Sequence, residues 1–448
     1  MKVLWLCNIM LPVIGDDLGL ECSNREGWLS GIYDQLQKES EAQRKAADRK
    51  ASVFPGDTDQ EILLGICFPM QEIPEKVRSM CGDSPGFWMG HTRCYPFEEN
   101  LCHPECYDTG LEGQLKEIVE DFQPDLIHIF GTEFPHALAM VTAAQKPERT
   151  LVGIQGLCAA CAGAYMADLP EAVIRRRTFR DWVRKDSIRQ QQEKFRIRGE
   201  REQQLLQQVG HVTGRTDFDR EEVRKIHPEA VYHSMNETMR QVFYTGSWSQ
   251  EQCRPRSIFL SQGDYPLKGF HYILQAMPEI LAEYPEACIY VAGNSIVEDQ
   301  SLKDRIRLSS YGKYLLELME TYGIRDRVNI LGKLTAEEMK QQMLEASVFV
   351  CPSSMENSPN SMAEAMLLGV PVVCSRTGGI PSLLEDGREG LLVEPGDIRG
   401  LAEAVMSVWK QPEQAAARAE AGRERAALLY DGERNYQRLL EIYREICV

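Results

Sequence analysis

The segment 346–375 constrains the fold of this chain more than any other part of it. The run Ala346 to Cys351 is apolar and has the length of a strand, and a second apolar run follows Gly369. Between them, Ser358 is a good N-cap and Pro359 suits the first position of a helix that Gly369 ends. The segment therefore predicts strand, loop, helix and strand, the repeating unit of a parallel α/β sheet.

Two glutamates lie eight positions apart in this segment, Glu356 on the loop and Glu364 inside the helix. The start of a helix binds anions through its backbone NH groups, so we expect a diphosphate to bind there. The residues concerned are Asn357, Ser358, Pro359, Asn360 and Ser361, of which Pro359 has no backbone NH to donate. We expect Glu364 to accept hydrogen bonds from two neighbouring ribose hydroxyls, and Glu356 to lie near the sugar of the same ligand.

The order of these elements is more specific than the spacing of the two carboxylates. Strand, Pro-Ser, Glu356, helix, Glu-Ala-Met, GVPVV at 369–373 and TGGIP at 377–381 follow one another. This series resembles the signature of the group 1 (family 4) retaining glycosyltransferases. The resemblance covers residues 255–400 well and the N-terminal half more loosely. It implies an α/β GT-B fold, in which two Rossmann-like domains face a central cleft.

A chain of 448 residues has the length of two domains. We expect an N-terminal acceptor-binding domain over 1–245 and a nucleotide-sugar-binding domain over 246–428, while the resemblance implies a last helix, 429–448, that packs back on the first domain. Strand patterns occur at 2–8, 61–68, 125–130 and 151–154, then at 257–261, 287–292, 328–331, 347–351 and 371–374. A helical pattern covers 111–121.

Charge and composition exclude several classes of protein. The net charge of −17 disfavours nucleic acid as a partner. The absence of 18 consecutive apolar residues and of a cleavage site near the N-terminus predicts a cytoplasmic protein. The fourteen cysteines are spread along the chain and are expected to be free thiols. One group lacks the paired C-x2-C of a zinc site, so we predict no metal there: His91, Cys94, Cys102, His103 and Cys106.

Lys268 and Gly269 follow the first strand of the second domain, where a lysine on a tight loop supplies a point charge for a diphosphate. In the family an arginine precedes this lysine by five positions, but here that position is Gly263. Arg215 is a candidate for the missing cation, and its alternative role is an interdomain salt bridge. The resemblance also implies donor contacts at Gly27, in a glycine loop, and at the backbone of Gly332 to Leu334.

The first domain contributes a segment that resembles the D-x-x-H pattern of the family, with His128 near the end of a strand. Side chains at the carboxyl ends of parallel strands reach the binding crevice. We assign His128 a catalytic role, with a buried core histidine as the alternative, and Thr132 and Glu133 contacts to the acceptor sugar. Gln155 stands where many relatives have a histidine; it forms hydrogen bonds but cannot act as a base.

The resemblance implies a retaining hexosyl transfer that needs no cofactor and no metal. The donor is a nucleotide-diphosphate sugar, and we expect a UDP sugar because these donors are the commonest. Lys268, Glu356 and His128 would act in catalysis, and the acceptor would be a saccharide or a lipid-linked sugar. We expect a role in surface polysaccharide or glycoconjugate biosynthesis.

Three alternatives stay open to different degrees. A dehydrogenase is disfavoured, because no G-x-G-x-x-G follows a predicted strand. A nucleotide-sugar 2-epimerase shares the fold but lacks the Glu-Ala-Met helix. A pseudo-transferase that only binds a nucleotide sugar is favoured by Gly263 and Gln155, while Glu356, Glu364 and Lys268 argue against it.

The segment 171–201 is strongly basic within this acidic chain, with eleven Arg or Lys residues and five Asp or Glu residues. Apolar residues are interleaved with these charges, which is typical of helices with one apolar side. The hypothesis is a surface for an anionic membrane or an anionic acceptor, which would make the protein peripheral on the cytoplasmic membrane face. The alternative is a solvated basic helix face packed on the N-terminal sheet.

Overall fold

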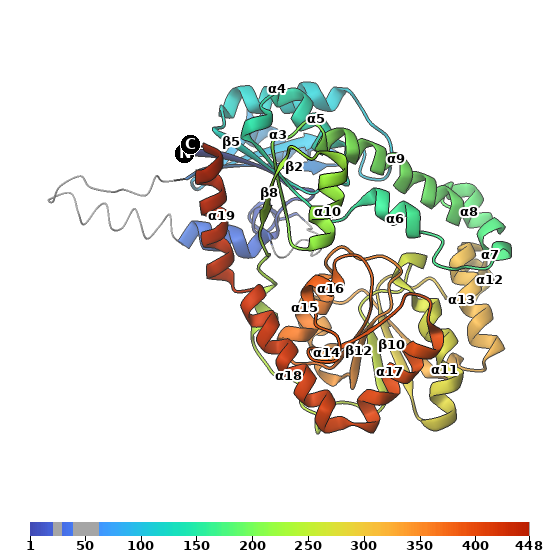
Figure 1. The fold of residues 1–448 in the computed structure, drawn as a ribbon. Helices are drawn as coiled ribbons and strands as arrows, with labels where there is room; N and C mark the ends of the chain where they lie inside the picture. The colour runs from blue at the N-terminus through green and yellow to red at the C-terminus, as the bar shows by residue number, and fades with distance from the viewer. Residues whose placement is uncertain (21–28, 39–61, 448) are drawn as a thin grey trace. The chain divides into compact units, whose positions relative to one another are not determined.

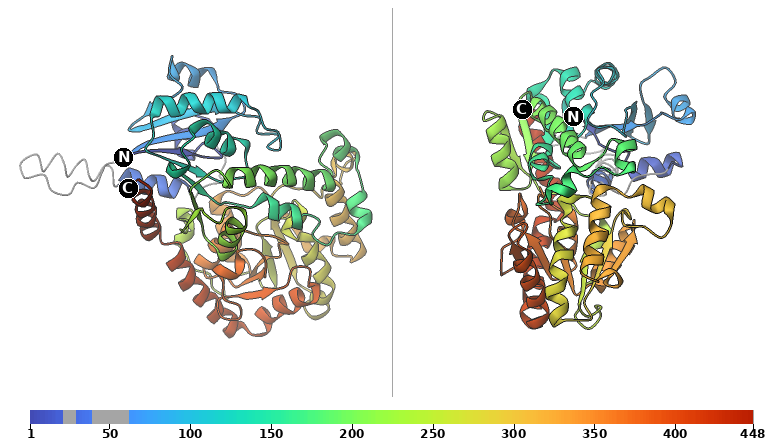
Figure 2. Two further views of the ribbon diagram at one scale, coloured as in Figure 1. Left: turned by 45° about the horizontal axis from the view of Figure 1, so that its top comes forward. Right: turned by 90° about the vertical axis from the view of Figure 1, so that its right-hand side faces the viewer.

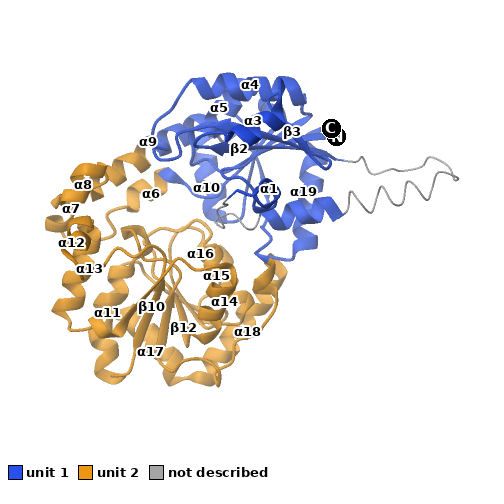
Figure 3. Ribbon diagram, turned by 180° about the vertical axis from the view of Figure 1, so that it is seen from behind, with its two compact units in different colours: residues 1–158, 197–240, 430–448 blue, residues 159–196, 241–429 orange. Residues whose placement is uncertain are grey.

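The computed structural model describes residues 1–20, 29–38 and 62–447. The chain forms two compact units (Figure 3). Unit 1 comprises Met1–Cys158, Ile197–Arg240 and Tyr430–Val448, and unit 2 comprises Ala159–Arg196 and Gln241–Leu429. Within the described ranges, no helix combines the length and the apolar character needed to cross a bilayer.

Unit 1 is an eight-stranded sheet in the order β3-β4-β2-β1-β5-β6-β7-β8, with helices on both faces (Figure 1). All neighbouring strands are parallel except β3 and β4. The strands are β1 Lys2–Leu6, β2 Leu63–Met70, β3 Phe87–Met89, β4 Thr92–Glu98, β5 Leu126–Phe130, β6 Thr150–Gly153, β7 His211–Gly214 and β8 Val231–Ser234. The helices include α1 Pro12–Leu18, α3 Glu75–Cys81, α4 Gly110–Phe122, α5 Pro135–Ala144, α10 Asp217–Ile226 and α19 Gly432–Cys447.

Unit 2 is a six-stranded parallel sheet in the order β11-β10-β9-β12-β13-β14, again covered by helices (Figure 2). The strands are β9 Ser257–Leu260, β10 Cys288–Ala292, β11 Val328–Gly332, β12 Val348–Cys351, β13 Val372–Ser375 and β14 Leu391–Val393. The helices include α11 Phe270–Glu283, α12 Leu302–Arg307, α13 Ser310–Thr321, α14 Ala336–Glu345, α15 Asn360–Leu367, α16 Ile380–Leu383, α17 Ile398–Lys410 and α18 Pro412–Leu429.

Each sheet has one point where the chain reverses its direction of travel across the strands. In unit 1 this point lies between β1 and β5, and in unit 2 it lies between β9 and β12. The connections on the two sides of such a point leave a crevice at the carboxyl ends of the strands, where ligands of open α/β sheets bind. The fold therefore singles out the loops that follow β1, β5, β9 and β12.

The last helix, α19, belongs to unit 1, and its buried tyrosine joins two strands of the sheet. The hydroxyl of Tyr443 accepts a hydrogen bond from Trp5 Nε1 at 2.9 Å and bonds His128 Nδ1 at 2.7 Å. Trp5 lies in β1 and His128 in β5, the two strands beside the reversal point of this sheet. This helix therefore closes the core of unit 1 beneath the loops that follow these strands.

The predicted boundary of the first domain at residue 245 is wrong in one respect, because residues 159–196 belong to unit 2 (Figure 3). This stretch contains α6 Cys158–Ala164, α7 Glu171–Arg175, α8 Phe179–Arg184 and the first part of α9 Ile188–Leu206. Its apolar residues Tyr165, Leu169, Val173 and Ile174 lie in the same buried core as α11 and α13. The basic segment is therefore not packed on the N-terminal sheet over residues 171–196, and Val173 and Ile174 of α7 contribute to the core of unit 2.

His271 on α11 fixes this stretch to unit 2. Its Nε2 lies 2.8 Å from the carbonyl oxygen of Ala167 and its Nδ1 lies 3.1 Å from the hydroxyl of Tyr311. The residues that follow His271 and Ala167 also bond each other: the hydroxyl of Tyr272 donates to Asp168 Oδ2 at 2.8 Å. Burial lowers the pKa of His271 to about 4, although the Ala167 carbonyl and Asp168 act in the opposite direction.

A histidine held neutral by the fold makes stability depend on pH. In the unfolded chain His271 takes up a proton near pH 6.5, whereas in unit 2 it does so only near pH 4. As the pH is lowered from 6.5 to 4, the free energy of unfolding should therefore decrease by about 1.4 kcal/mol per pH unit on account of this residue. Because glutamine takes up no proton, His271→Gln should lose that slope in urea titrations, while the exposed His103→Gln should keep it. Equal slopes in wild type and His271→Gln would contradict this prediction.

Candidate functional site

Lys268 and Glu356 meet at the reversal point of the unit 2 sheet. Lys268 lies at the end of a short 3-10 turn, Pro266–Lys268, that follows β9, and Glu356 lies on the loop between β12 and α15. The distance from Lys268 Nζ to Glu356 Oε1 is 2.6 Å, and Ser353 Oγ donates to the same oxygen at 2.8 Å. The structure thus brings together two residues that lie 88 positions apart in the chain and that the sequence assigns to one site.

This ion pair is mostly shielded from solvent, with 21% of the Lys268 side chain and 11% of the Glu356 side chain exposed. Burial favours the neutral amine, but the carboxylate of Glu356 outweighs it and raises the pKa of Lys268 well above its usual range. Lys268 therefore carries a positive charge in this site, balanced by the carboxylate of Glu356. An ammonium group of this kind stabilises a second anion if a ligand phosphate approaches it.

Two glycines allow the Glu356 loop to pack this closely. Gly269 has a φ of +68°, and a Cβ there would lie 1.9 Å from the carbonyl oxygen of Pro352. Gly378, in the TGGIP segment, has a φ of +50°, and a Cβ there would lie 2.0 Å from the carbonyl oxygen of Glu356. Residues with a side chain cannot take either place without moving the loop. Gly269 and Gly378 are therefore steric requirements of one loop.

Helix α15 begins one residue later than predicted. Pro359 has extended backbone and precedes the helix, and Asn360 is the first helical residue, so Ser358 is not the N-cap. Ser261, after β9, donates from its hydroxyl to Ser361 Oγ at 2.9 Å and joins the two loops across the reversal point. Asn357 and Ser358 are buried, while Asn360 and Ser361 are partly exposed at the start of the helix.

Glu364 lies on the second turn of α15, and only 3% of it is exposed. The carboxylates of Glu356 and Glu364 therefore differ in environment: the first is on the loop and partly accessible, and the second is inside the unit. The contact of Glu364 with ribose stays a prediction.

Gly263 occupies the position where the family has an arginine, and the packing explains its identity. A Cβ at this position would lie 2.9 Å from ring atom Cδ1 of Phe270 and 2.9 Å from Cγ2 of Val291. A long side chain does not fit there unless both neighbours move. The loop after β9 therefore has Lys268 as its cation.

Arg215, the predicted second cation, lies in unit 1 and forms a buried ion pair within that unit. Its Nη1 lies 2.6 Å from Glu237 Oε2, and both side chains are 3% exposed. The alternative of an interdomain salt bridge is wrong for this pair, because residues 197–240 belong to one unit. Glu237 also accepts a hydrogen bond from Gln155 Nε2 at 2.7 Å through its other oxygen.

The predicted acceptor residues of unit 1 lie in one polar cluster at the carboxyl end of β5 and β6. The hydroxyl of Thr132 is buried and donates to Glu202 Oε2 at 2.7 Å, and its contact with an acceptor sugar stays a prediction. Glu133 is partly exposed, and burial raises its pKa, although the Arg198 guanidinium acts in the opposite direction. Gln155 is held by Glu237, so its amide is already oriented.

The catalytic assignment of His128 is wrong. The residue is fully buried in β5, with its ring against Phe130 and its Nδ1 bonded to Tyr443. Burial lowers the pKa of His128 to about 3, so it stays neutral in the folded unit. It is the core histidine of the alternative interpretation.

The remaining predicted residues have simple outcomes. Gly27 lies outside the described residues. Gly332 ends β11 with a φ of +76°, and Leu334 follows it on the loop before α14. Among the residues that the structure describes, no three His, Cys, Asp or Glu side chains gather as a possible metal site, and Cys94 lies buried in β4 while Cys102 is exposed.

Sequence reasoning missed the roles of Ser353 and Ser261 in unit 2 and of Glu237 and Glu202 in unit 1, and it gave Gly378 only as part of the TGGIP motif. Ser353 precedes Glu356 by three positions, a spacing typical of a Ser side chain that supports a nearby carboxylate. Glu237 and Glu202 carry no such local signal, because their partners lie far away in the sequence.

The two glycines of the loop give a prediction with an internal control. Gly387 also lies in unit 2 with a φ of +76°, but a Cβ there would meet nothing within 4 Å. Gly387→Ala should therefore lose about 1 kcal/mol of unfolding free energy from backbone strain alone. Gly269→Ala and Gly378→Ala should each lose at least about twice as much in urea unfolding, because a backbone carbonyl blocks the added methyl group. Equal losses of unfolding free energy in all three variants would contradict this prediction and show that the Glu356 loop moves to accommodate the added methyl group.

Comparisons with known proteins agree with this geometry. The profile of the family described as Glycosyl transferases group 1 matches residues 251–425. The D-inositol 3-phosphate glycosyltransferase of Corynebacterium urealyticum is 32% identical over 180 residues, which are 40% of this chain and 41% of that protein. The alpha-maltose-1-phosphate synthase of Mycolicibacterium smegmatis is 38% identical over 119 residues, 25% of this chain and 31% of that protein. The chain thus matches less than half of the length of these relatives.

Solved structures match over a longer range at lower identity. Sucrose-phosphate synthase from Thermosynechococcus elongatus superimposes with a TM-score of 0.60 and 17% identity, covering 100% of this chain and 99% of that one. HepE from Anabaena, in complex with UDP-glucose, gives a TM-score of 0.63 and 15% identity, covering 99% and 100%. These identities show the fold alone. Residues 251–425 of this chain therefore resemble the group 1 glycosyltransferases, and the chain has the GT-B fold of two parallel-sheet units.

Proposed function

We propose that this protein transfers a hexose from a nucleotide-diphosphate sugar to an acceptor hydroxyl with retention of the anomeric configuration. The observation that carries the proposal is the Lys268 and Glu356 pair beside the start of α15, at the reversal point of the unit 2 sheet. A cation, helix NH groups and a partly exposed carboxylate are the groups that a diphosphate with a sugar attached needs. A UDP sugar is the proposed donor, since HepE was solved with UDP-glucose.

The proposed reaction takes place on one face of the sugar. The bond between the anomeric carbon and the diphosphate oxygen breaks, and a bond from that carbon to the acceptor oxygen forms. The proton of the acceptor hydroxyl passes to the departing diphosphate oxygen. Lys268 and the NH groups at the start of α15 stabilise the negative charge that develops on the diphosphate, and Glu356 orients the sugar hydroxyls. In this scheme the chain needs neither a metal nor a side-chain base, which removes any need for His128.

The proposed acceptor is a saccharide or a lipid-linked sugar in the synthesis of a polysaccharide or glycoconjugate. The names of relatives support this class of acceptor. One relative is a putative colanic acid biosynthesis glycosyltransferase of Escherichia coli, 34% identical over 116 residues. We propose Glu133 and Gln155 of unit 1 as acceptor contacts and the cytoplasm, with the membrane surface, as the place of action. A catalytically weak protein that only binds a nucleotide sugar is the second candidate, since Gly263 leaves no room for the family's arginine.

Three measurements on the purified protein test the proposal. Incubation with candidate nucleotide sugars and acceptors should release nucleoside diphosphate, and proton NMR of the first product should show the anomeric configuration of the donor. The same activity should survive EDTA. An inverted product would contradict the retaining mechanism, activity that EDTA abolishes and Mg²⁺ restores would contradict metal independence, and binding without turnover would favour the second candidate.

Removal of the site lysine should slow the reaction strongly. Lys268→Ala should lower turnover at least a hundredfold, about 2.7 kcal/mol of transition-state stabilisation, because no other cation on the β9 loop faces the diphosphate. The exposed Lys313→Ala on α13 controls for the loss of one charge from unit 2 and should keep wild-type turnover. Near-normal turnover in Lys268→Ala would move the role to another residue.

The two glutamates should separate nucleotide binding from turnover. Glu364→Ala should weaken the binding of bare UDP about tenfold or more, because two hydrogen bonds from ribose hydroxyls to a carboxylate are lost. Glu356→Ala should spare UDP binding and lower turnover with the intact donor. Calorimetric titration of both variants, after their thermal transitions have been matched to wild type, checks the split. Wild-type affinity for UDP in Glu364→Ala would refute the ribose assignment.

A further inference from the structure

Two short helices of unit 2 present apolar side chains to solvent. On α8 these are Phe179, Trp182 and Val183, and on α12 they are Leu302 and Ile306, each more than half exposed. Their spacing of three or four positions puts the residues of each helix on one face. The helices α8 and α12 contact each other and lie together at one end of unit 2 (Figures 1 and 3). The five side chains therefore belong to one region, which we term the α8/α12 face.

The orientation of α8 is fixed by polar contacts on its other side. Thr178 and Asp181 form a capping box at its start. The buried carboxylate of Asp181 also accepts hydrogen bonds from the backbone NH of Ser310, at 3.0 Å, and from its hydroxyl. Next to it, Arg176 pairs with Glu317 at 2.9 Å. Because the polar side of α8 is anchored to α13, its apolar side is directed away from unit 2, which reverses the usual arrangement of a surface helix.

The sequence of these two helices and of the residues beside them is basic. Residues 175–189 and 302–307 contain ten Arg or Lys residues and three Asp residues, within a chain of net charge −17. Several of these cations are exposed: Arg175, Arg177, Arg184, Lys185, Lys303, Arg305 and Arg307. A basic ring around exposed aromatic and aliphatic side chains combines the two attractions that hold a peripheral protein at an anionic bilayer.

We infer that the α8/α12 face docks on a bilayer of anionic phospholipid. Phe179 and Trp182 insert at the level of the headgroups, and the surrounding Arg and Lys side chains bind lipid phosphates. A second copy of this chain fits less well, because a symmetric contact would bring two positive faces together. A protein partner also fits less well, since it would need an acidic patch matched to this face, whereas an anionic bilayer offers negative charge over its whole surface. This inference does not rest on the proposed transfer reaction, because it concerns a surface of unit 2 and is measured without substrate.

Co-sedimentation of the full-length protein with vesicles tests the inference. Wild type should bind vesicles that contain phosphatidylglycerol, should bind vesicles of phosphatidylcholine alone at least tenfold more weakly, and should be released at high ionic strength. The triple variant Phe179→Ser, Trp182→Ser and Val183→Ser should bind at least tenfold more weakly. The charge variant Arg177→Glu, Arg184→Glu and Lys185→Glu should do so as well.

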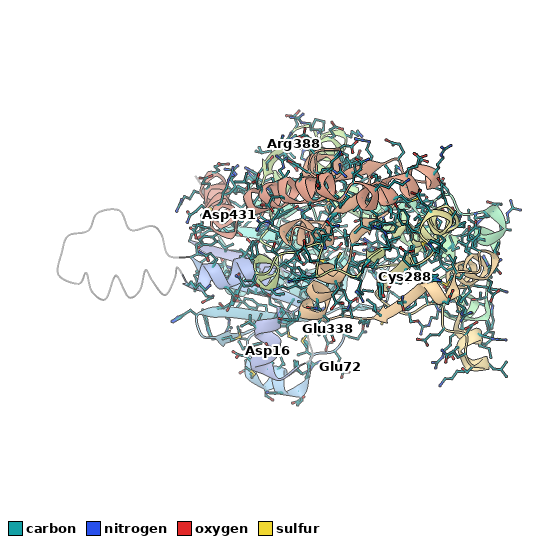
Figure 4. The ribbon with its side chains drawn as sticks, turned by 90° about the horizontal axis from the view of Figure 1, so that it is seen from below. Asp16, Glu72, Cys288, Glu338, Arg388 and Asp431 are labelled. Atoms are coloured by element: carbon teal, nitrogen blue, oxygen red, sulfur yellow. The ribbon has the colours of Figure 1, made fainter. Side chains whose placement is uncertain are left out.

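Control variants carry smaller changes of the same kind elsewhere on unit 2. Leu428→Ser replaces an exposed leucine of α18, and the double variant Arg388→Glu and Arg425→Glu reverses one charge on the loop after α16 and one on α18 (Figure 4). Both should bind as wild type does. Because every altered side chain is exposed, the variants should retain the wild-type thermal transition.

Bromine-labelled lipids give a second readout that does not depend on a loss of binding. They should quench tryptophan fluorescence of the wild type on vesicle binding, and Trp182→Phe should bind with similar affinity but with clearly weaker quenching. Wild type that ignores anionic vesicles, serine variants that bind as well as wild type, or quenching unchanged in Trp182→Phe would each overturn the inference. A dimer that dissociates in the serine variant would assign the face to a second copy instead.

Discussion

The ion pair between Lys268 and Glu356 is the contact on which the candidate site depends. It joins the loops after β9 and β12, the two strands between which the unit 2 sheet reverses. Each partner needs the other inside a mostly shielded region, because an unpaired charge there would be costly. Ser353 completes the arrangement by donating to the same carboxylate oxygen. The charges of the proposed donor site are therefore in place before any ligand arrives, as preorganised electrostatic stabilisation requires.

The surroundings of this pair explain why distant parts of the sequence matter to it. Gly269 and Gly378 permit backbone contacts that a side chain would block. The stretch 159–196 lies in the sequence between two segments of unit 1 but packs into the core of unit 2. It also contacts the loop that carries Glu356, because Ser354 Oγ lies 3.4 Å from the carbonyl oxygen of Ala164. One stretch thus supports the donor loop on its inner side and, on α8, carries the exposed apolar face that we infer to meet lipid.

The sequence predicted the strands beside each reversal point, the Lys268 and Glu356 loops and the last helix, since these follow from apolar runs, turn residues and a motif. It did not predict β3, β4, β7, β8 or β14, which are short or mixed in polarity, nor that 159–196 packs on unit 2. His128 was misassigned because position at a strand end does not reveal which face a side chain takes. Its bond to Tyr443, 315 positions away, has no local signal. Pairs such as Arg215 and Glu237 are equally invisible before the chain is folded.

The most direct test of the account is a double-mutant cycle on Lys268 and Glu356, read as the dissociation constant for UDP. If Lys268 exchanges the carboxylate for the diphosphate, Lys268→Ala should weaken binding, while Glu356→Gln, which frees the lysine, should strengthen it. In the double variant the effect of Glu356→Gln should vanish, because there is no lysine left to free. Additive effects of the two changes, or UDP affinity that Lys268→Ala does not alter, would contradict the claim that this pair forms the diphosphate site.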